Sequence, residues 1–193
     1  MSMFCYQCEQ TAKGTGCTAF GVCGKDPRVA ALQDVLVHLA KGIAQYAHRA
    51  ATLGKTDPDI DHFILQALFT TVTNVNFDPG RILEGIHEGA VVRLKAKALY
   101  EAAAGPGAEP LQGPAAWEPA RNTEALLDQA AEIGIQARIN SLGETVAGLQ
   151  ELLLYGLKGT AAYMDHAVIL GKSDPSVAAF FAEALSFLSL IHI

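Results

Sequence analysis

The sequence predicts an all-α protein, and three observations support this prediction. Aspartate-proline pairs recur where an N-cap residue followed by proline in the first turn would begin a helix. Apolar residues between these pairs recur at intervals of three and four, the period of one helical face. No convincing run of alternating strand residues occurs, although residues 135–139 could form a short extended piece.

Three helices are expected in the first half of the chain, residues 26–104. The first begins at Asp26-Pro27 and ends near Gly54, the second begins at Asp57-Pro58 and runs towards Asn74, and the third begins at Asp78-Pro79 and ends near Ala104. An apolar stripe that includes Leu32 and Leu39 marks the core face of the first helix. We expect these helices to form an antiparallel three-helix bundle.

A connection rich in proline and glycine, residues 105–121, divides the chain. Residues 105–119 contain four prolines and three glycines and cannot continue a helix. Trp117 is expected to anchor this connection on a bundle. Beyond it, Asn122 should cap a short helix ending near Gly134, Ser141-Leu142-Gly143-Glu144 has the pattern of a capping box before a long helix ending near Gly171, and Asp174-Pro175 should begin the last helix.

The two halves are related by a repeat with an offset of 117 residues, which aligns residues 32–58 with residues 149–175. Identical pairs include Leu32/Leu149, Gln33/Gln150, Lys41/Lys158, Gly42/Gly159, Tyr46/Tyr163, Gly54/Gly171, Asp57/Asp174 and Pro58/Pro175. Such self-similarity indicates one supersecondary unit used twice. The second bundle, residues 122–193, would need a third helix after Leu185. We therefore expect it to be incomplete, with an exposed apolar groove that favours self-association.

The repeated polar positions have simple structural interpretations. Tyr46 and Tyr163 lie on apolar stripes and are expected in the core. Lys41-Gly42 and Lys158-Gly159 lack the glycine-rich loop and preceding strand of a phosphate site, so we expect close helix packing beside solvated lysines. None of the six histidines belongs to a recognisable metal motif, and each is expected to be structural.

Composition excludes several classes of partner. The 193 residues carry a net charge of -6, and no basic block suggests nucleic acid. The first residues lack the pattern of a secretory signal. Residues 178–193 are too short to span a bilayer comfortably and contain Glu183. A membrane span is therefore not expected, and the cytoplasm is the expected location.

All four cysteines lie within residues 1–25, at Cys5, Cys8, Cys17 and Cys23, with the spacing C-x2-C-x8-C-x5-C. In a reducing compartment, clustered thiols more often bind metal than form disulfides. Structural zinc normally uses two short-spaced pairs, whereas an iron-sulfur cluster accepts uneven spacings. The spacing favours an iron-sulfur cluster and leaves zinc, a disulfide or inert thiols as alternatives.

The most distinctive segments of the chain are residues 3–11, Gly16-Cys17 and residues 21–25, followed by residues 32–34, 69–74 and 152–167. Together they resemble the hybrid cluster proteins, also called hydroxylamine reductases or prismane proteins. The resemblance extends from Met3 to about Leu185, and Met1-Ser2 look like a short extension. Residues 186–193 stop resembling the family, which suggests truncation with a foreign or frame-shifted tail.

This resemblance implies a cytoplasmic oxidoreductase with two iron-sulfur centres. One is a cubane 4Fe-4S cluster held by Cys5, Cys8, Cys17 and Cys23. The other is a hybrid iron-sulfur-oxygen cluster that reduces hydroxylamine, and by resemblance nitric oxide, through ligands in two later α/β domains. None of those ligand positions exists among these residues. The chain would therefore be an electron-transfer domain, inactive by itself, that accepts electrons from a donor protein or reductase.

A second hypothesis comes from a different class of protein. Four thiolates are also a complete ligand set for structural zinc. The chain would then be a non-catalytic helical binding or assembly protein with a zinc site made of its four cysteines.

Overall fold

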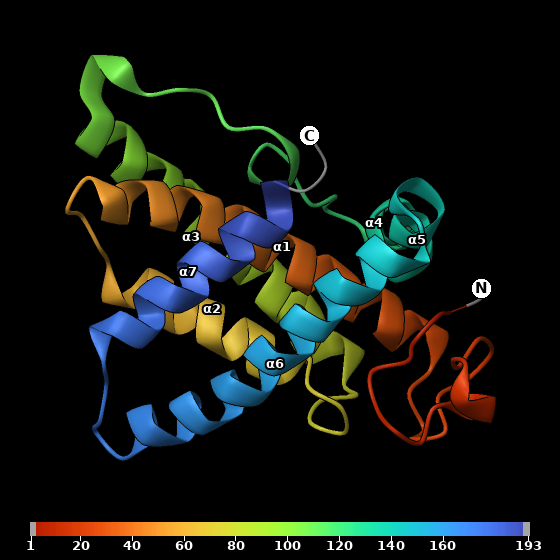
Figure 1. Cartoon of the computed structure of the whole chain (residues 1–193). Coiled ribbons are helices and arrows are strands. Elements are labelled where there is room, and N and C mark those ends of the chain that lie inside the picture. Colours follow the sequence, from red (N-terminus) through yellow and green to blue (C-terminus); the bar gives the residue numbers. More distant parts are fainter. Residues whose placement is uncertain (1–2, 191–193) are drawn as a thin grey trace.

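The computed structural model describes residues 3–190 and confirms the all-α prediction (Figure 1). Its elements are η1 (Ala12–Gly14), α1 (Pro27–Thr52), α2 (Pro58–Thr70), α3 (Pro79–Ala104), η2 (Gly105–Gly107), η3 (Gly113–Ala115), α4 (Thr123–Ile133), α5 (Ile135–Leu142), α6 (Glu144–Ile169) and α7 (Pro175–Leu190). Within the described range, the β structure is limited to an isolated antiparallel bridge between Cys5 and Cys17.

The predicted starts of the first three helices are confirmed by their caps. The side chains of Asp26, Asp57 and Asp78 each accept a backbone N–H of the first turn, and a proline follows each aspartate. α2 ends at Thr70, earlier than the predicted end towards Asn74, which has a positive φ of 65°. The chain therefore turns away from the helix before Asn74.

Two local predictions in the second half are wrong. Residues 135–139 are helical, because they belong to α5, which packs on α6 and buries Ile135. Ser141 does not cap α6: it lies in the last turn of α5 and its hydroxyl donates to the carbonyl of Arg138. Gly143, with φ 81°, both ends α5 and precedes α6, so no residue remains for a capping box.

The predicted repeat is visible in the helix boundaries. α1 spans residues 27–52 and α6 spans residues 144–169, so both ends differ by the same offset of 117. α2 and α7 also begin at equivalent prolines, Pro58 and Pro175. Gly54 and Gly171 have φ values of 75° and 71°, which confirms the predicted helix-ending turns with positive φ.

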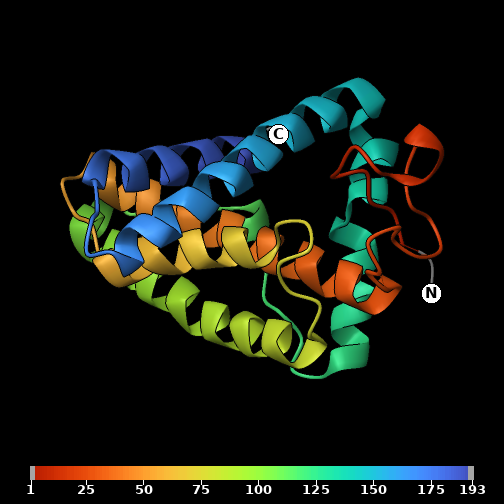
Figure 2. The same cartoon turned by 90° about the horizontal axis from the view of Figure 1, so that it is seen from below.

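α1 occupies the centre of the fold (Figures 1 and 2). α2, α3, α4, α7 and η3 all pack against it, whereas α6 packs mainly against α2 and α5. The largest hydrophobic cluster contains side chains from α1, α2, α3, α4, α6 and α7. Residues assigned to the first and second predicted bundles therefore share one core.

The Pro/Gly-rich connection crosses α1 at close range. A Cβ atom at Gly42 would collide with the carbonyl oxygen of Pro114, so glycine permits this approach. Trp117 packs against the core and meets His38 edge-to-face at 5.1 Å, which confirms its predicted anchoring role.

Three predictions about equivalent positions of the repeat are wrong, two of them only for the position in α6 and one for the positions in both α1 and α6. Tyr46 is buried, but Tyr163 is exposed because no helix covers that face of α6 among the described residues. Lys41 and Lys158 are both buried rather than solvated. Gly159 has open space around its Cα, so it does not mark close packing.

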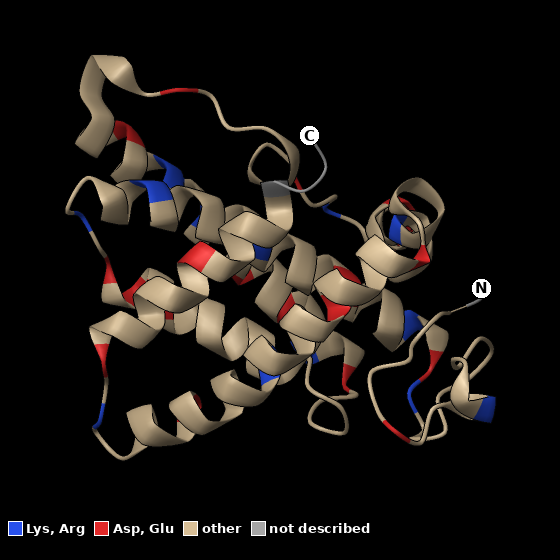
Figure 3. Ribbon diagram, viewed as in Figure 1, with Lys and Arg blue, Asp and Glu red and all other residues tan. Residues whose placement is uncertain are grey.

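No helix among the described residues is long and apolar enough to cross a membrane. Lys and Arg positions are interspersed with Asp and Glu positions along the ribbon (Figure 3). α7 continues helically through residues 186–190, which the sequence suggested to be part of a foreign tail. The predictions on Met1-Ser2 and on residues 191–193, including His192, lie outside the described residues.

Candidate metal centre

The cysteine-rich segment folds as a loop beside the beginning of α1 (Figures 1 and 2). Its two arms are joined at the bridge, where the N–H of Cys5 donates to the carbonyl of Cys17 at 3.0 Å and the reverse bond measures 2.8 Å. The hydroxyl of Thr11 also donates to the carbonyl of Cys5 at 3.1 Å. These bonds place cysteines that are distant in sequence on adjacent arms.

All four cysteines line one small cavity of about 10 Å³. They are free thiols, and Cys17 is the most buried of them. Met3, Gln7, Thr11, Gly21, Val22, Lys25 and Thr73 complete the lining. No three His, Cys, Asp or Glu side chains within residues 3–190 are grouped closely enough to hold a single metal ion. The thiols therefore share a cavity without converging on one ion-sized point.

The surroundings of the sulfurs differ between the two arms. The backbone N–H of Ala12 donates to Cys17 Sγ at 3.4 Å. Backbone N–H groups of Ala12 and Val22 lower the pKa of the Cys17 thiol, because they stabilise the thiolate. Burial raises the pKa of Cys5, and the backbone N–H of Gln7 partly opposes that effect. The surroundings of Cys17 thus favour the thiolate form more than those of Cys5 do.

Glycine is required where the loop passes close to neighbouring groups. A Cβ atom at Gly16 would lie 2.7 Å from the Phe4 ring, and one at Gly21 would lie 3.1 Å from Cys23 Sγ. Gly24 adopts a φ of 93°, which other residues rarely accept. Four thiols, N–H donors to sulfur and a close-fitting glycine backbone form a donor set that suits an iron-sulfur cluster.

A second polar region adjoins this cavity and was missed by sequence reasoning. The ammonium group of Lys158 in α6 donates to Gln7 Oε1 at 3.1 Å and to the carbonyl of Thr71 at 3.2 Å. Lys25, also buried, donates to Gln33 Oε1 at 2.6 Å. These contacts tie the cysteine loop to both repeats. The identical pairs Lys41/Lys158 and Gln33/Gln150 were the available signal, but lysine normally lies at the surface.

Fold and site together define an all-helical protein that carries a four-cysteine loop at one end. Residues 3–189 match the Prismane/CO dehydrogenase family, and the chain belongs to this family. The match reaches beyond Leu185, where the sequence alone placed the end of the resemblance.

Several curated relatives are named hydroxylamine reductase. The protein of Rhodospirillum rubrum is 50% identical over 190 residues, which cover 97% of this chain and 35% of the relative. The proteins of Acidithiobacillus ferrooxidans and Geobacter sulfurreducens are 49% and 48% identical, covering 97% and 96% of this chain and 35% and 34% of theirs. The chain thus spans about a third of the length of these relatives.

Proposed function

We propose that this chain is the electron-transfer part of a hydroxylamine reductase and holds a 4Fe-4S cluster through Cys5, Cys8, Cys17 and Cys23. The main support is that all four thiols line one cavity, within a chain about 50% identical to a hydroxylamine reductase. The cluster would transfer one electron at a time, and a donor protein or reductase would reduce it again. We place the protein in the cytoplasm, where clustered thiols stay reduced.

The proposed reaction combines hydroxylamine with two electrons and two protons and yields ammonia and water. The residues present here would hold the cluster, and the Ala12 N–H would donate to one of its thiolate sulfurs. A cluster with four thiolate ligands offers no open position for substrate. Hydroxylamine would therefore bind at the family's hybrid cluster, whose ligands lie outside these 193 residues.

Anaerobic reconstitution with iron and sulfide tests the cluster assignment. The wild-type chain should bind about four irons and four sulfides and turn brown, as expected for a cubane cluster. Cys17→Ser should lose or degrade the cluster, whereas Thr18→Ser, at the exposed neighbouring position, should keep it. Zinc with negligible iron in the reconstituted chain would contradict the assignment.

Assays with a reduced dye test whether this chain transfers electrons without itself reducing hydroxylamine. The reconstituted chain should accept electrons, seen as bleaching of its visible absorption, and should form no ammonia above that produced by free cluster. Sustained ammonia production by the homogeneous chain would place the active site in these residues and overturn the proposal.

The alternative is a helical binding or assembly protein whose four cysteines hold structural zinc. A zinc-thiolate protein is colourless, because Zn²⁺ has a filled d shell. Purification without oxygen, followed by metal analysis, separates the two hypotheses before any activity is measured.

The exposed apolar side chains of α6 and α7 support the predicted self-association. Leu149, Leu152 and Tyr163 are exposed on α6, and Phe180 and Phe187 on α7. We propose that the isolated chain associates through this face. The double change Leu149→Glu, Leu152→Glu should shift sedimentation towards monomer, whereas Leu94→Glu, at an exposed leucine of α3, should not. Equal effects of both changes would argue against the α6 face.

A further inference from the structure

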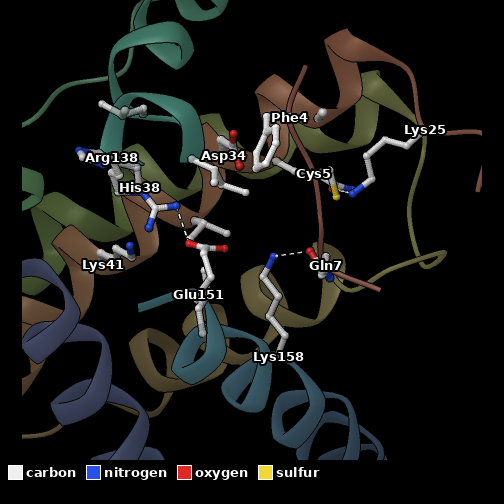
Figure 4. Close-up of a pocket in the computed structure, with 16 residues that line it drawn as sticks. Phe4, Cys5, Gln7, Lys25, Asp34, His38, Lys41, Arg138, Glu151 and Lys158 are labelled. Carbon is white, nitrogen blue, oxygen red and sulfur yellow. Dashed lines mark hydrogen bonds and ion pairs between the residues drawn. The ribbon is translucent and has the colours of Figure 1, made fainter. Parts of the chain in front are cut away.

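A polar pocket lies between α1, α5, α6 and the cysteine loop (Figure 4). It has a volume of about 30 Å³. Its charged lining residues are Lys25, Asp34, Lys41, Arg138, Glu151 and Lys158. A single water needs about 10–15 Å³, so this pocket has room for about two waters or one small ion.

The repeat places equivalent charges on opposite sides of this pocket. Asp34 and Lys41 of α1 correspond, at the offset of 117, to Glu151 and Lys158 of α6. In Figure 4, Lys41 and Lys158 come from these two helices and lie on either side of Glu151. The pocket is therefore built by the same positions of both repeats.

The two equivalent lysines nevertheless differ in their partners. Lys158 donates to Gln7 and to the carbonyl of Thr71. Lys41 is only 5% exposed and lines the pocket, and its ammonium forms no hydrogen bond or ion pair among residues 3–190. Because Lys41 lines the pocket, an anion there would accept a charge-assisted hydrogen bond from this ammonium.

Two of the remaining charged groups are paired with residues other than Lys41. Arg138 forms an ion pair with Glu151, and Lys25 donates to Gln33. The four cations of the lining face two carboxylates, which leaves an excess of positive charge. Gln150 lies beside Arg138, and its buried Nε2 donor also lacks a partner. The carboxylates of Asp34 and Glu151 also line the pocket, and Glu151 Oε1 accepts no hydrogen bond within the described part of the chain, but they do not balance the four cations.

We propose that this pocket binds one small monovalent inorganic anion, with up to about three heavy atoms, held chiefly by the ammonium of Lys41 together with Arg138. Chloride, bromide and nitrite have the required charge and size, whereas sulfate is larger and divalent. The proposal does not depend on the identity of the metal in the cysteine loop.

Anion binding should weaken as the pH rises through neutrality. Burial lowers the pKa of Lys41 to about 7, assisted by the charge of Arg138. The titratable groups that line the pocket with it are Cys5 and Lys25 of the loop, Asp34 and His38 of α1, Arg138 of α5, and Glu151 and Lys158 of α6. Burial raises the pKa of Asp34 to about 6, so its growing charge would also oppose an anion above that pH.

Calorimetric titration of the whole chain with sodium nitrite and with sodium bromide, in a buffer free of other small anions, tests this proposal. Both anions should bind with a stoichiometry of about one, and affinity should fall by about tenfold or more in Lys41→Met, since a charge-assisted bond is lost. Lys172→Met, at an exposed lysine, is the matched control and should bind as wild type. Sulfate should not compete.

Bromide soaks of crystals provide a second test that needs no variant. An anomalous peak beside Lys41 Nζ would support the proposal, even if Lys41→Met fails to fold. Absence of that peak at a bromide concentration that saturates the calorimetric signal would overturn it. So would absence of binding to the wild-type chain, or unchanged affinity in Lys41→Met.

Discussion

The two repeats have the same apolar stripe, but only the first one buries it. Leu32 and Tyr46 of α1 are 0% and 4% exposed, whereas their counterparts Leu149 and Tyr163 of α6 are 63% and 81% exposed. α1 is surrounded by α2, α3, α4, α7 and η3, while α6 packs mainly on α2 and α5. The pattern of a helix therefore tells which face can be buried, and its neighbours determine whether it is.

The opposite, polar positions behave differently from the apolar stripe. Gln33 and Gln150 are both buried, and so are Lys41 and Lys158. Lys41 and Lys158 both line the pocket between the repeats. The interface between repeats is thus symmetrical in burial, while the outer faces are not.

Truncation of the equivalent leucines should give the largest difference in unfolding free energy between the two repeats. Leu32→Ala should lower the free energy of unfolding by about 2–5 kcal/mol, because it leaves a cavity in the core. Leu149→Ala should change it by only about 0.5 kcal/mol, since that side chain is largely exposed. Urea unfolding of both variants measures the difference. Equal losses would show that α6 is covered in solution.

Alanine at equivalent glycines should have opposite effects. Gly42→Ala should destabilise the fold by about 1–3 kcal/mol, because its Cβ collides with the carbonyl oxygen of Pro114 in a packed connection. Gly159→Ala should stabilise it by about 0.5–1 kcal/mol, since its site is open and alanine favours helix. Thermal unfolding of both variants checks the sign. Destabilisation by Gly159→Ala would contradict the open environment of that glycine.

The buried lysines should make stability depend on pH. Burial lowers the pKa of Lys41 from 10.5 to about 7, so between these values the unfolded chain binds more protons than the folded one. The free energy of unfolding should therefore rise with pH across this window, by less than about 1.4 kcal/mol per pH unit for one group. This contribution is lost again as the pH falls through 7.

Lys41→Met should flatten that rise, and Lys172→Met should not. Unfolding in urea at several pH values measures the slopes, and because all chains keep the same cysteines, the difference from wild type isolates Lys41. An unchanged slope in Lys41→Met would contradict the lowered pKa.

Substitutions at the two helix-ending glycines should have equal effects on stability. Gly54 and Gly171 have nearly equal positive φ values and open surroundings. Gly54→Ala and Gly171→Ala should each cost about 1 kcal/mol, because alanine disfavours this conformation. The expected difference between them is close to zero. A large difference in thermal unfolding would show that the second turn is not formed like the first.

Local chemistry explains what sequence reasoning predicted well. Sequence reasoning predicted the aspartate-proline starts of the first three helices, the lengths of α1 and α3, and the repeat offset. These features follow from caps, proline geometry and the apolar period, which act within a few residues. The four cysteines were recognisable as one candidate site, because their spacing already restricts the chemistry. Ser141 was misjudged because Gly143 forms the boundary between α5 and α6, which leaves Ser141 inside the last turn of α5.

The tertiary structure decided which side chains are buried and which groups meet. The repeat pattern predicted the same environment for Tyr46 and Tyr163, and a solvated one for Lys41 and Lys158, because burial depends on helices far away in the chain. The pocket that joins Lys41, Arg138 and Glu151 arises only when α1, α5 and α6 come together. Helix propensity and capping depend on residues that are close in sequence. Desolvation and charge pairing depend on residues that are close in space, and many of these belong to other helices.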